Sequence, residues 1–260
     1  ESTAALSAMV TGLLFATQGI GLGLTLDPAW LLLPVSLGIA MLVGALIGFI
    51  NGFFVVRVGM AAFIVTLASF IWVRGLVVAI SGGRSAQRLP DAIRVVGTED
   101  ILGIPLLAWI SVACFVIFSI LMAKTPFGRY ITLVGGNAEA TYRAGINSNR
   151  ILWSSFVVAG LLAGVAGWLL AIRTSGATAN LGTGMLFNAF AAVVIGGISL
   201  KGGIGKLPGV YAGVLLLYSI HTAINLMGLP AHYTQVILGG LVLAAVLLDT
   251  LKLRLREKLL

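Results

Sequence analysis

Apolar residues occur along this chain in long stretches that are separated by short polar segments. A helix that crosses a bilayer needs about 20 mostly apolar residues, and most of these stretches approach or exceed that length. We therefore predict an all-α membrane protein, a polytopic bundle of about eight transmembrane helices. The predicted spans cover residues 4–24, 30–54, 60–81, 102–122, 151–172, 185–200, 208–226 and 233–249. Composition shifts nowhere along residues 1–260, which predicts a single transmembrane domain.

Two of the connecting segments are long and polar. Residues 82–101 are of mixed charge, whereas residues 123–150 are mostly basic. Inside the second segment, the residues from Glu139 to Gly145 are typical of a short helix that ends at a glycine, and Asn137 is a suitable N-cap. Such a helix can dock in a cleft of another protein, although the same composition also suits an ordinary solvated loop.

The charge composition indicates lipid as the main solvent. Hydrophobic residues make up 59% of the chain and charged residues only 9%, against about 25% charged residues in a soluble domain. A net charge of +8 would suggest nucleic acid for a soluble protein. Here the basic residues lie between apolar stretches, so we interpret them as topology signals and lipid contacts, with no nucleic-acid partner.

The distribution of Lys and Arg predicts the orientation of the chain. With 123–150 in the cytoplasm and eight spans, the cytoplasmic side holds most of the basic residues, as the positive-inside rule requires. Both ends of this chain then lie in the cytoplasm. The cytoplasmic residues are Arg57, Lys124, Arg129, Arg143, Arg150, Lys201, Lys206, Lys252, Arg254, Arg256 and Lys258, and the outer ones are Arg84, Arg88, Arg94 and Arg173.

The span at 185–200 is short and is interrupted by Gly196 and Gly197. It is either a broken crossing helix or a re-entrant segment, of the kind that transporters use along their pathways. If this segment did not cross, the basic residues of 252–258 would move outside, against the charge rule. We therefore expect it to cross.

The sequence contains no constellation for catalysis and no cluster with metal-ligand spacing. The phosphate-binding pattern GxxxxGK[ST] is absent, since 202–207 lacks both the spacing and the Ser or Thr. We expect no catalytic residue, no metal and no cofactor in this chain, and no ATP hydrolysis by it.

Ionisable residues inside the predicted spans are few, which disfavours a proton- or sodium-driven carrier. Arg74 lies near the outer end of its span and is expected to snorkel to the headgroups. His221 is either a hydrogen-bonded packing residue or a group that lines a pathway. Polar residues within spans must find partners, and most of them are expected to bond neighbouring helices. A minority would suit the path of a neutral hydroxylated solute; the candidates are Asn51, Thr66, Asn188, Ser219, His221 and Asn225.

Several stretches in a fixed order resemble the permease subunit of the ribose/xylose class of bacterial ATP-binding-cassette (ABC) sugar importers. The resemblance covers nearly the whole chain, from about residue 5 to residue 249. The stretches are 44–52 (GALIGFING), 62–67 (AFIVTL), 125–130 (TPFGRY), 135–140 (GGNAEA), 144–146 (AGI), 188–200 (NAFAAVVIGGISL) and 202–205 (GGIG).

The resemblance implies a membrane subunit that moves a monosaccharide across the bacterial inner membrane. It implies a second permease subunit, identical or related, cytoplasmic ATPase subunits that carry ATP and Mg²⁺, and a periplasmic or lipid-anchored sugar-binding protein. It also implies that the ATPase docks on the cytoplasmic loop 123–150, in which Thr141 stands where relatives usually have Ala. The implied coupling residues are Gly135, Gly136, Asn137, Glu139, Ala140, Arg143 and Gly145.

Similar proteins have about ten spans, so the resemblance implies a chain that is truncated at its N-terminus by two. An alternative hypothesis is a stand-alone channel or secondary carrier for a small neutral polar solute. The loop that resembles a coupling segment and the absence of carboxylates within the spans argue against this alternative.

Overall fold

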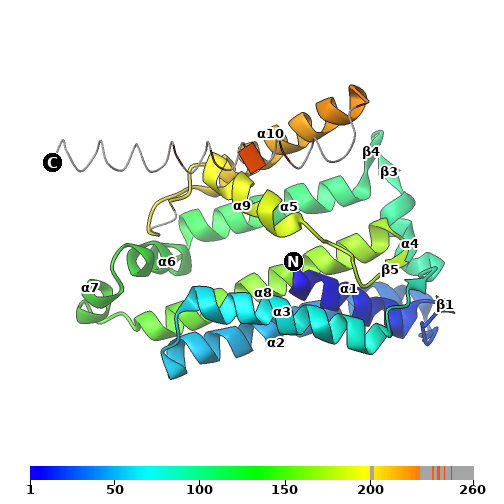
Figure 1. Cartoon of the computed structure of the whole chain (residues 1–260), viewed down its shortest axis with the longest axis horizontal. Coiled ribbons are helices and arrows are strands. Elements are labelled where there is room, and N and C mark those ends of the chain that lie inside the picture. The colour runs from blue at the N-terminus through cyan, green and yellow to red at the C-terminus, as the bar shows by residue number, and fades with distance from the viewer. Residues whose placement is uncertain (200–201, 229–235, 237–238, 241–242, 244–246, 248–260) are drawn as a thin grey trace. The chain divides into compact units, whose positions relative to one another are not determined.

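The computed structural model describes residues 1–199 and 202–228, and beyond them residues 236, 239, 240, 243 and 247. Helices account for most of these residues (Figure 1). The α-helices are α1 (Ser2–Phe15), α2 (Leu32–Phe53), α3 (Ala62–Ser81), α4 (Asp91–Thr98), α5 (Leu106–Lys124), α6 (Pro126–Gly136), α7 (Ala138–Arg143), α8 (Ser148–Arg173), α9 (Met185–Ile195) and α10 (Leu207–Leu226). Short 3₁₀ and π segments, η1 (Ala29–Leu31) and η2 (Phe54–Val58), flank α2.

Five helical segments of the described chain are long and apolar enough to cross a membrane. They confirm a mostly helical membrane protein with several spans. The segments are Ala29–Val58, Ala62–Ser81, Leu106–Lys124, Ser148–Arg173 and Leu207–Leu226. The span predicted at 233–249 falls, apart from single positions, outside the described residues.

The prediction of one helix over 4–24 is wrong at its C-terminal end, because α1 stops at Phe15. The chain turns into extended backbone at Ala16, and Gln18 lies in a strand rather than in a span. Gly19 follows with φ of +78°, a conformation that glycine adopts without a steric penalty. The glycine-rich stretch after α1 therefore forms a turn, although its apolar residues resemble a continuing helix.

The chain divides into two compact units. Unit 1 comprises Glu1–Val112 and Asn149–Thr183, and unit 2 comprises Ala113–Ser148 and Gly184–Leu260.

In unit 1, α1 packs against both α2 and α3 (Figure 1). Most of its side chains are buried, including Met9 and Phe15, so α1 is covered by protein on nearly all sides. The core continues through Val73 and Val77 of α3 and Ile172 of α8.

Helices α2 and α8 approach each other closely through glycines. A Cβ atom on Gly44 would lie 2.2 Å from the carbonyl oxygen of Gly160, and one on Gly48 would lie 2.2 Å from that of Phe156. As the residue number rises along α2 it falls along α8, so the two helices run antiparallel. Small residues let membrane helices pack backbone to backbone in this way, as the glycine content predicts.

A small antiparallel sheet in unit 1 joins three segments that follow helices. Strand β2 (Ala86–Gln87) lies between β1 (Gln18–Gly19) and β5 (Gly176–Ala177). In this register Ala86 pairs with Gly19 on one side and with Ala177 on the other. The sheet therefore brings the chain after α1, after α3 and after α8 to one place.

The segment between α3 and α5 contains structure that the sequence analysis did not predict. Helix α4 buries Ile93 and Val96, and Pro90 immediately precedes its first residue. A second antiparallel pair is formed by β3 (Asp100–Ile101) and β4 (Ile104–Pro105). Proline next to the start of a helix is a recognisable signal, whereas strands of two residues leave no periodic pattern.

In unit 2, α9 packs against α10. Their contact buries Ala191, Ala192 and Leu217, and a Cβ on Gly213 would lie 2.3 Å from the carbonyl oxygen of Ala192. The aromatic rings of Phe115 and Tyr211 meet edge to face with 5.0 Å between their centroids. Helix α9 has 11 residues and ends at Ile195, which confirms a short helix that Gly196 and Gly197 interrupt.

Candidate functional site

The segment 123–150 contains two helices, α6 and α7, that meet at Asn137. Asn137 is extended, and its side-chain oxygen accepts a hydrogen bond of 2.9 Å from the backbone N–H of Ala140. This is the N-cap arrangement that the sequence predicts. At the other end Gly145 has φ of +86°, and the N–H of Ile146 donates to the carbonyl of Thr141 at 3.2 Å. The predicted short helix with a glycine stop is therefore confirmed.

Helix α7 has one anchored side and one exposed side. Thr141 is buried, and its hydroxyl donates to the carbonyl of Asn137 at 2.7 Å. Glu139 and Arg143 are largely exposed and form an ion pair of 2.5 Å across one turn, and Tyr142 beside them is 65% exposed. The hydroxyl of Thr141 thus strengthens the first turn of α7 from its buried side.

A polar contact in unit 2 ties the first residue of α7 to the start of α8. The buried hydroxyl of Ser148, the first residue of α8, donates to the carbonyl of Ala138 at 2.8 Å. Residue Ala140 lies on the exposed surface next to Glu139. Helix α7 is therefore held against the start of α8, with Glu139 and Ala140 exposed.

The end of α6 touches the chain that follows α9, backbone against backbone. A Cβ on Gly135 would lie 2.7 Å from the nitrogen of Gly203, and one on Gly202 would lie 2.6 Å from the carbonyl oxygen of Gly135. A Cβ on Gly136, by contrast, would meet nothing within 4 Å. The sequence analysis did not pair these segments, because they are more than 60 residues apart.

The candidate path residues of unit 1 lie on α2 and α3. Asn51 is half-buried, and its side-chain oxygen accepts a hydrogen bond from the hydroxyl of Ser69 on α3. This hydrogen bond joins α2 to α3, as we expected for most polar residues within the spans. Thr66 is exposed and donates to the carbonyl of Ala62 in its own helix at 2.9 Å.

The candidate path residues of unit 2 lie on α9 and α10. Asn188 is half-buried on α9. On α10, the side-chain nitrogen of Asn225 lies 3.2 Å from Nδ1 of His221, one turn apart. Ser219 is exposed and donates to the carbonyl of Leu215. The structure thus brings His221 and Asn225 together, and the role of all six residues in a path stays a prediction.

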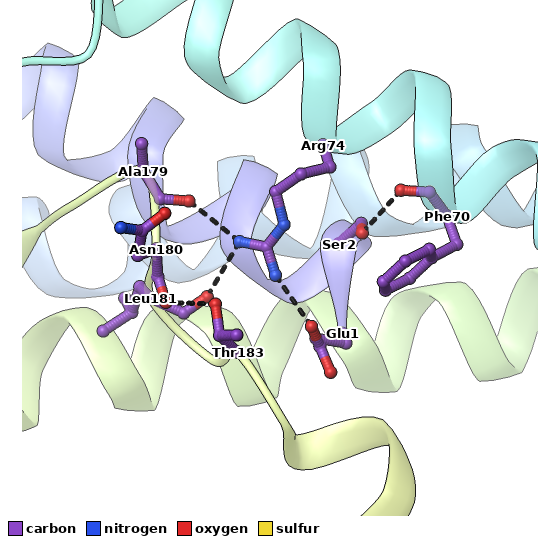
Figure 2. Close-up of polar contacts among 8 residues, drawn as sticks. All are labelled: Glu1, Ser2, Phe70, Arg74, Ala179, Asn180, Leu181 and Thr183. Atoms are coloured by element: carbon purple, nitrogen blue, oxygen red, sulfur yellow. Dashed lines mark hydrogen bonds and ion pairs between the residues drawn. The ribbon is translucent and has the colours of Figure 1, made fainter.

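Arg74 does not reach toward headgroups as predicted, because it is held inside unit 1 (Figure 2). Its guanidinium donates to the carbonyls of Ala179 and Leu181 at 2.8 and 3.2 Å and pairs with the carboxylate of Glu1 at 2.9 Å. Its side chain is 20% exposed and that of Glu1 only 4%. A buried guanidinium needs such partners, and they come from segments more than 70 residues away in the sequence.

Within the described part of the chain, no group of three His, Cys, Asp or Glu residues could hold a metal ion. The long apolar helices of the described chain define a multi-pass membrane protein.

The chain belongs to the family described as "Branched-chain amino acid transport system / permease component", which matches residues 1–246. This membership confirms the predicted class, a transporter permease component rather than an enzyme.

Curated relatives are sugar permeases. The chain is 38% identical over 217 residues to the L-arabinose ABC transporter permease protein AraH of Azospirillum brasilense, covering 83% of this chain and 64% of that one. It is 37% identical to the L-arabinose transport system permease protein AraH of Escherichia coli, with 78% of this chain and 62% of the relative covered. It is 36% identical to the ribose import permease protein RbsC of Haemophilus influenzae, with 85% and 69% covered.

The chain thus spans less than two thirds of the length of the two arabinose permeases. No solved structure matches it.

Proposed function

We propose that this chain forms the membrane-spanning part of an ABC importer for a monosaccharide of the arabinose or ribose type. The observation that carries the proposal is α7, an exposed helix with a cap at each end, in a chain that belongs to a permease family. Movement of the sugar takes place by a change in shape of the permease, and a separate ATPase subunit that binds ATP and Mg²⁺ supplies the energy.

The coupling surface comprises the end of α6 and the exposed side of α7, within the cytoplasmic loop 123–150. Its residues are Gly135, Gly136, Asn137, Glu139, Ala140, Arg143 and Gly145. The Glu139–Arg143 pair is exposed and contributes little to folding, so its charges remain available for complementary charges on the ATPase. Gly135 links this surface to Gly203 and so to α9.

We further propose eight crossings with both ends in the cytoplasm. The sheet β1–β2–β5 supports this arrangement in unit 1, because it joins the two segments that the charge rule assigns to the outer side, after α3 and after α8, with the chain that follows α1. The contact between Gly135 and Gly203 supports it in unit 2, since both belong to segments that the rule assigns to the cytoplasm. The span at 185–200 then crosses as the short helix α9 with non-helical ends, as in transporters with discontinuous helices.

The proposed partners are the other subunits of an ABC importer. A second permease subunit, identical or related, completes the path, and a sugar-binding protein outside the membrane delivers the solute. Relatives of this chain are named as arabinose and ribose permeases, which favours a neutral monosaccharide as solute. Polar residues without fixed charge, such as Asn188 and Asn225, suit the path of such a solute.

The test is sugar uptake by proteoliposomes that contain the permease, its ATPase and its binding protein. We expect uptake of L-arabinose or D-ribose to require ATP, and Glu139→Lys to abolish both uptake and co-purification of the ATPase. Asp91→Lys is the matched control, because Asp91 is an exposed acid of another surface ion pair, on α4. ATPase binding that survives Glu139→Lys and also Gly145→Val would contradict the coupling surface.

The alternative, a stand-alone channel or secondary carrier, predicts a different result in the same experiment. The permease alone would then move the solute in liposomes without the ATPase. Uptake that is independent of ATP would establish the alternative and overturn the proposed importer.

A further inference from the structure

Unit 1 contains a polar cleft beside the sheet β1–β2–β5. Its volume is about 700 Å³, within the range of about 300–1,000 Å³ that is usual for small-molecule sites. One wall is formed by Arg84 and Ser85, between α3 and β2, with Gln87 of β2, and the other by the segment after β5, with Thr178 and Asn180. The cleft therefore lies at the ends of α1, α3 and α8.

The groups that line this cleft match a neutral polyhydroxy ligand. The amide nitrogen of Gln87 donates to the hydroxyl of Ser85 at 2.8 Å, which leaves Gln87 its carbonyl oxygen and a second N–H. Thr178 adds a hydroxyl and Asn180 a second amide. None of the described residues that line it carries a carboxylate, so a cation finds no counter-charge there. Sugar hydroxyls, which donate and accept in the same way, can be satisfied by these side chains.

A neighbouring cleft of about 470 Å³ suits a neutral solute less well. Gln87 and Thr178 line it too, but it also contains Arg88 and Arg94. Two guanidinium groups raise the cost of binding a ligand that brings no negative charge. The larger cleft, in which Arg84 is the one cation among the described lining residues, is the better candidate.

Arg74 holds one wall of the larger cleft in place. Its guanidinium binds the carbonyls of Ala179 and Leu181, the residues on either side of Asn180 (Figure 2). The hydroxyl of Thr183 donates to the carbonyl of Asn180 itself at 2.7 Å. The backbone at Asn180 is thus fixed at three consecutive carbonyls, while its side chain remains exposed at the cleft.

We propose that this cleft is a receiving site for the monosaccharide on the outer side of the membrane, with Gln87 and Thr178 as binding residues, Asn180 as the wall position that reports occupancy, and Arg74 as a positioning residue. The inference rests on the proposed function, which makes the transported solute a sugar and places the sheet outside. A fixed wall matters here, because a solute that arrives from a binding protein must be taken up by groups that are already oriented.

The experiment uses Asn180→Cys in the complex of permease, ATPase and binding protein in proteoliposomes. A membrane-impermeant maleimide is added outside, with or without D-ribose or L-arabinose, and the rate of labelling is measured. The unsubstituted chain gives the background from Cys114, which is half-buried on α5. Thr98→Cys is the matched control, since Thr98 is exposed on α4 and does not line the cleft.

We expect the sugar to slow labelling at position 180 and to leave position 98 unchanged. Adding Gln87→Ala should raise the half-protecting sugar concentration roughly fivefold, the factor that corresponds to one net hydrogen bond. Equal labelling with and without sugar, equal protection at both positions, or no labelling from outside at position 180 would each overturn the inference.

Uptake measured in parallel separates this inference from the proposed function. A complex that imports the sugar but shows no protection at position 180 retains the proposed function and loses the receiving site. A complex that shows protection without import retains the site and loses the proposed function. If neither occurs, both proposals fail.

Discussion

Gly135 and Gly203 lie so close that a Cβ atom on Gly135 would come within 2.7 Å of the backbone nitrogen of Gly203. Gly135 lies in the last turn of α6, beside the proposed coupling helix, and Gly203 belongs to the chain that follows α9. Contacts of this kind leave no room for a side chain, so we expect a displacement of α6 to move the segment at Gly203 with it. We interpret the pair as the mechanical link between α7 and the broken span.

Gly135→Ala is expected to disrupt this link, whereas Gly136→Ala should not. The added methyl at position 135 would overlap backbone atoms, and at position 136 it would meet nothing within 4 Å. We expect Gly135→Ala to lower sugar uptake strongly and Gly136→Ala to leave it near the original rate, with both proteins still bound to the ATPase. Equal uptake by the two variants would show that the contact is not needed.

Asn137→Ala should weaken α7 at its first turn. The side chain of Asn137 satisfies the N–H of Ala140, and loss of an N-cap costs about 1 kcal/mol of helix stability. Hydrogen exchange at the amides of α7 should become faster, and less ATPase should co-purify with the permease. Asn137→Asp keeps the acceptor oxygen and should behave like the original chain; identical behaviour of the Ala and Asp variants would contradict the assigned cap.

Gly44→Ala should destabilise unit 1, and Gly38→Ala on the same helix should not. At position 44 the methyl would meet the carbonyl oxygen of Gly160, while at position 38 it would meet nothing within 4 Å. Overpacking of this kind typically costs about 1–3 kcal/mol. Thermal denaturation in detergent should therefore show a lower Tm for the first variant alone. A Tm unchanged by Gly44→Ala would mean that α2 and α8 can separate at no cost.

Arg74→Lys should loosen the wall of the cleft while keeping the positive charge beside Glu1. A lysine ammonium lacks the planar fork with which Arg74 reaches two carbonyls and a carboxylate. In the Asn180→Cys background we expect a higher half-protecting sugar concentration with the maximal uptake rate retained. A purely structural role would instead lower the maximal rate or the Tm and leave the half-protecting concentration unchanged.

Several elements could be predicted from the sequence because their causes are local. Five helices match predicted spans, since a long apolar stretch in lipid has to satisfy its backbone within itself. The cap at Asn137 and the glycine stop at Gly145 depend on residues a few positions apart. The break after Ile195 follows from the neighbouring glycines, and family membership agrees with the ordered motifs.

Other features depended on residues that are distant in the chain. The apolar pattern continued past Phe15, whereas the chain after α1 pairs with β2, a partner more than 60 residues away. From the sequence we expected Arg74, near the end of a span, to reach the lipid headgroups. Its partners in the structure are Glu1 and the carbonyls of Ala179 and Leu181. Nothing in the local sequence identifies backbone carbonyls as partners of a side chain.

By itself the sequence determined where helices form in lipid, how α7 is capped and to which family the chain belongs, because periodicity, caps and motifs are properties of neighbouring residues. The tertiary structure alone decided which glycines meet, where Arg74 finds its partners and that a polar cleft forms beside the sheet. Those contacts join segments tens of residues apart, and the packing of whole helices, rather than any local preference, selects them.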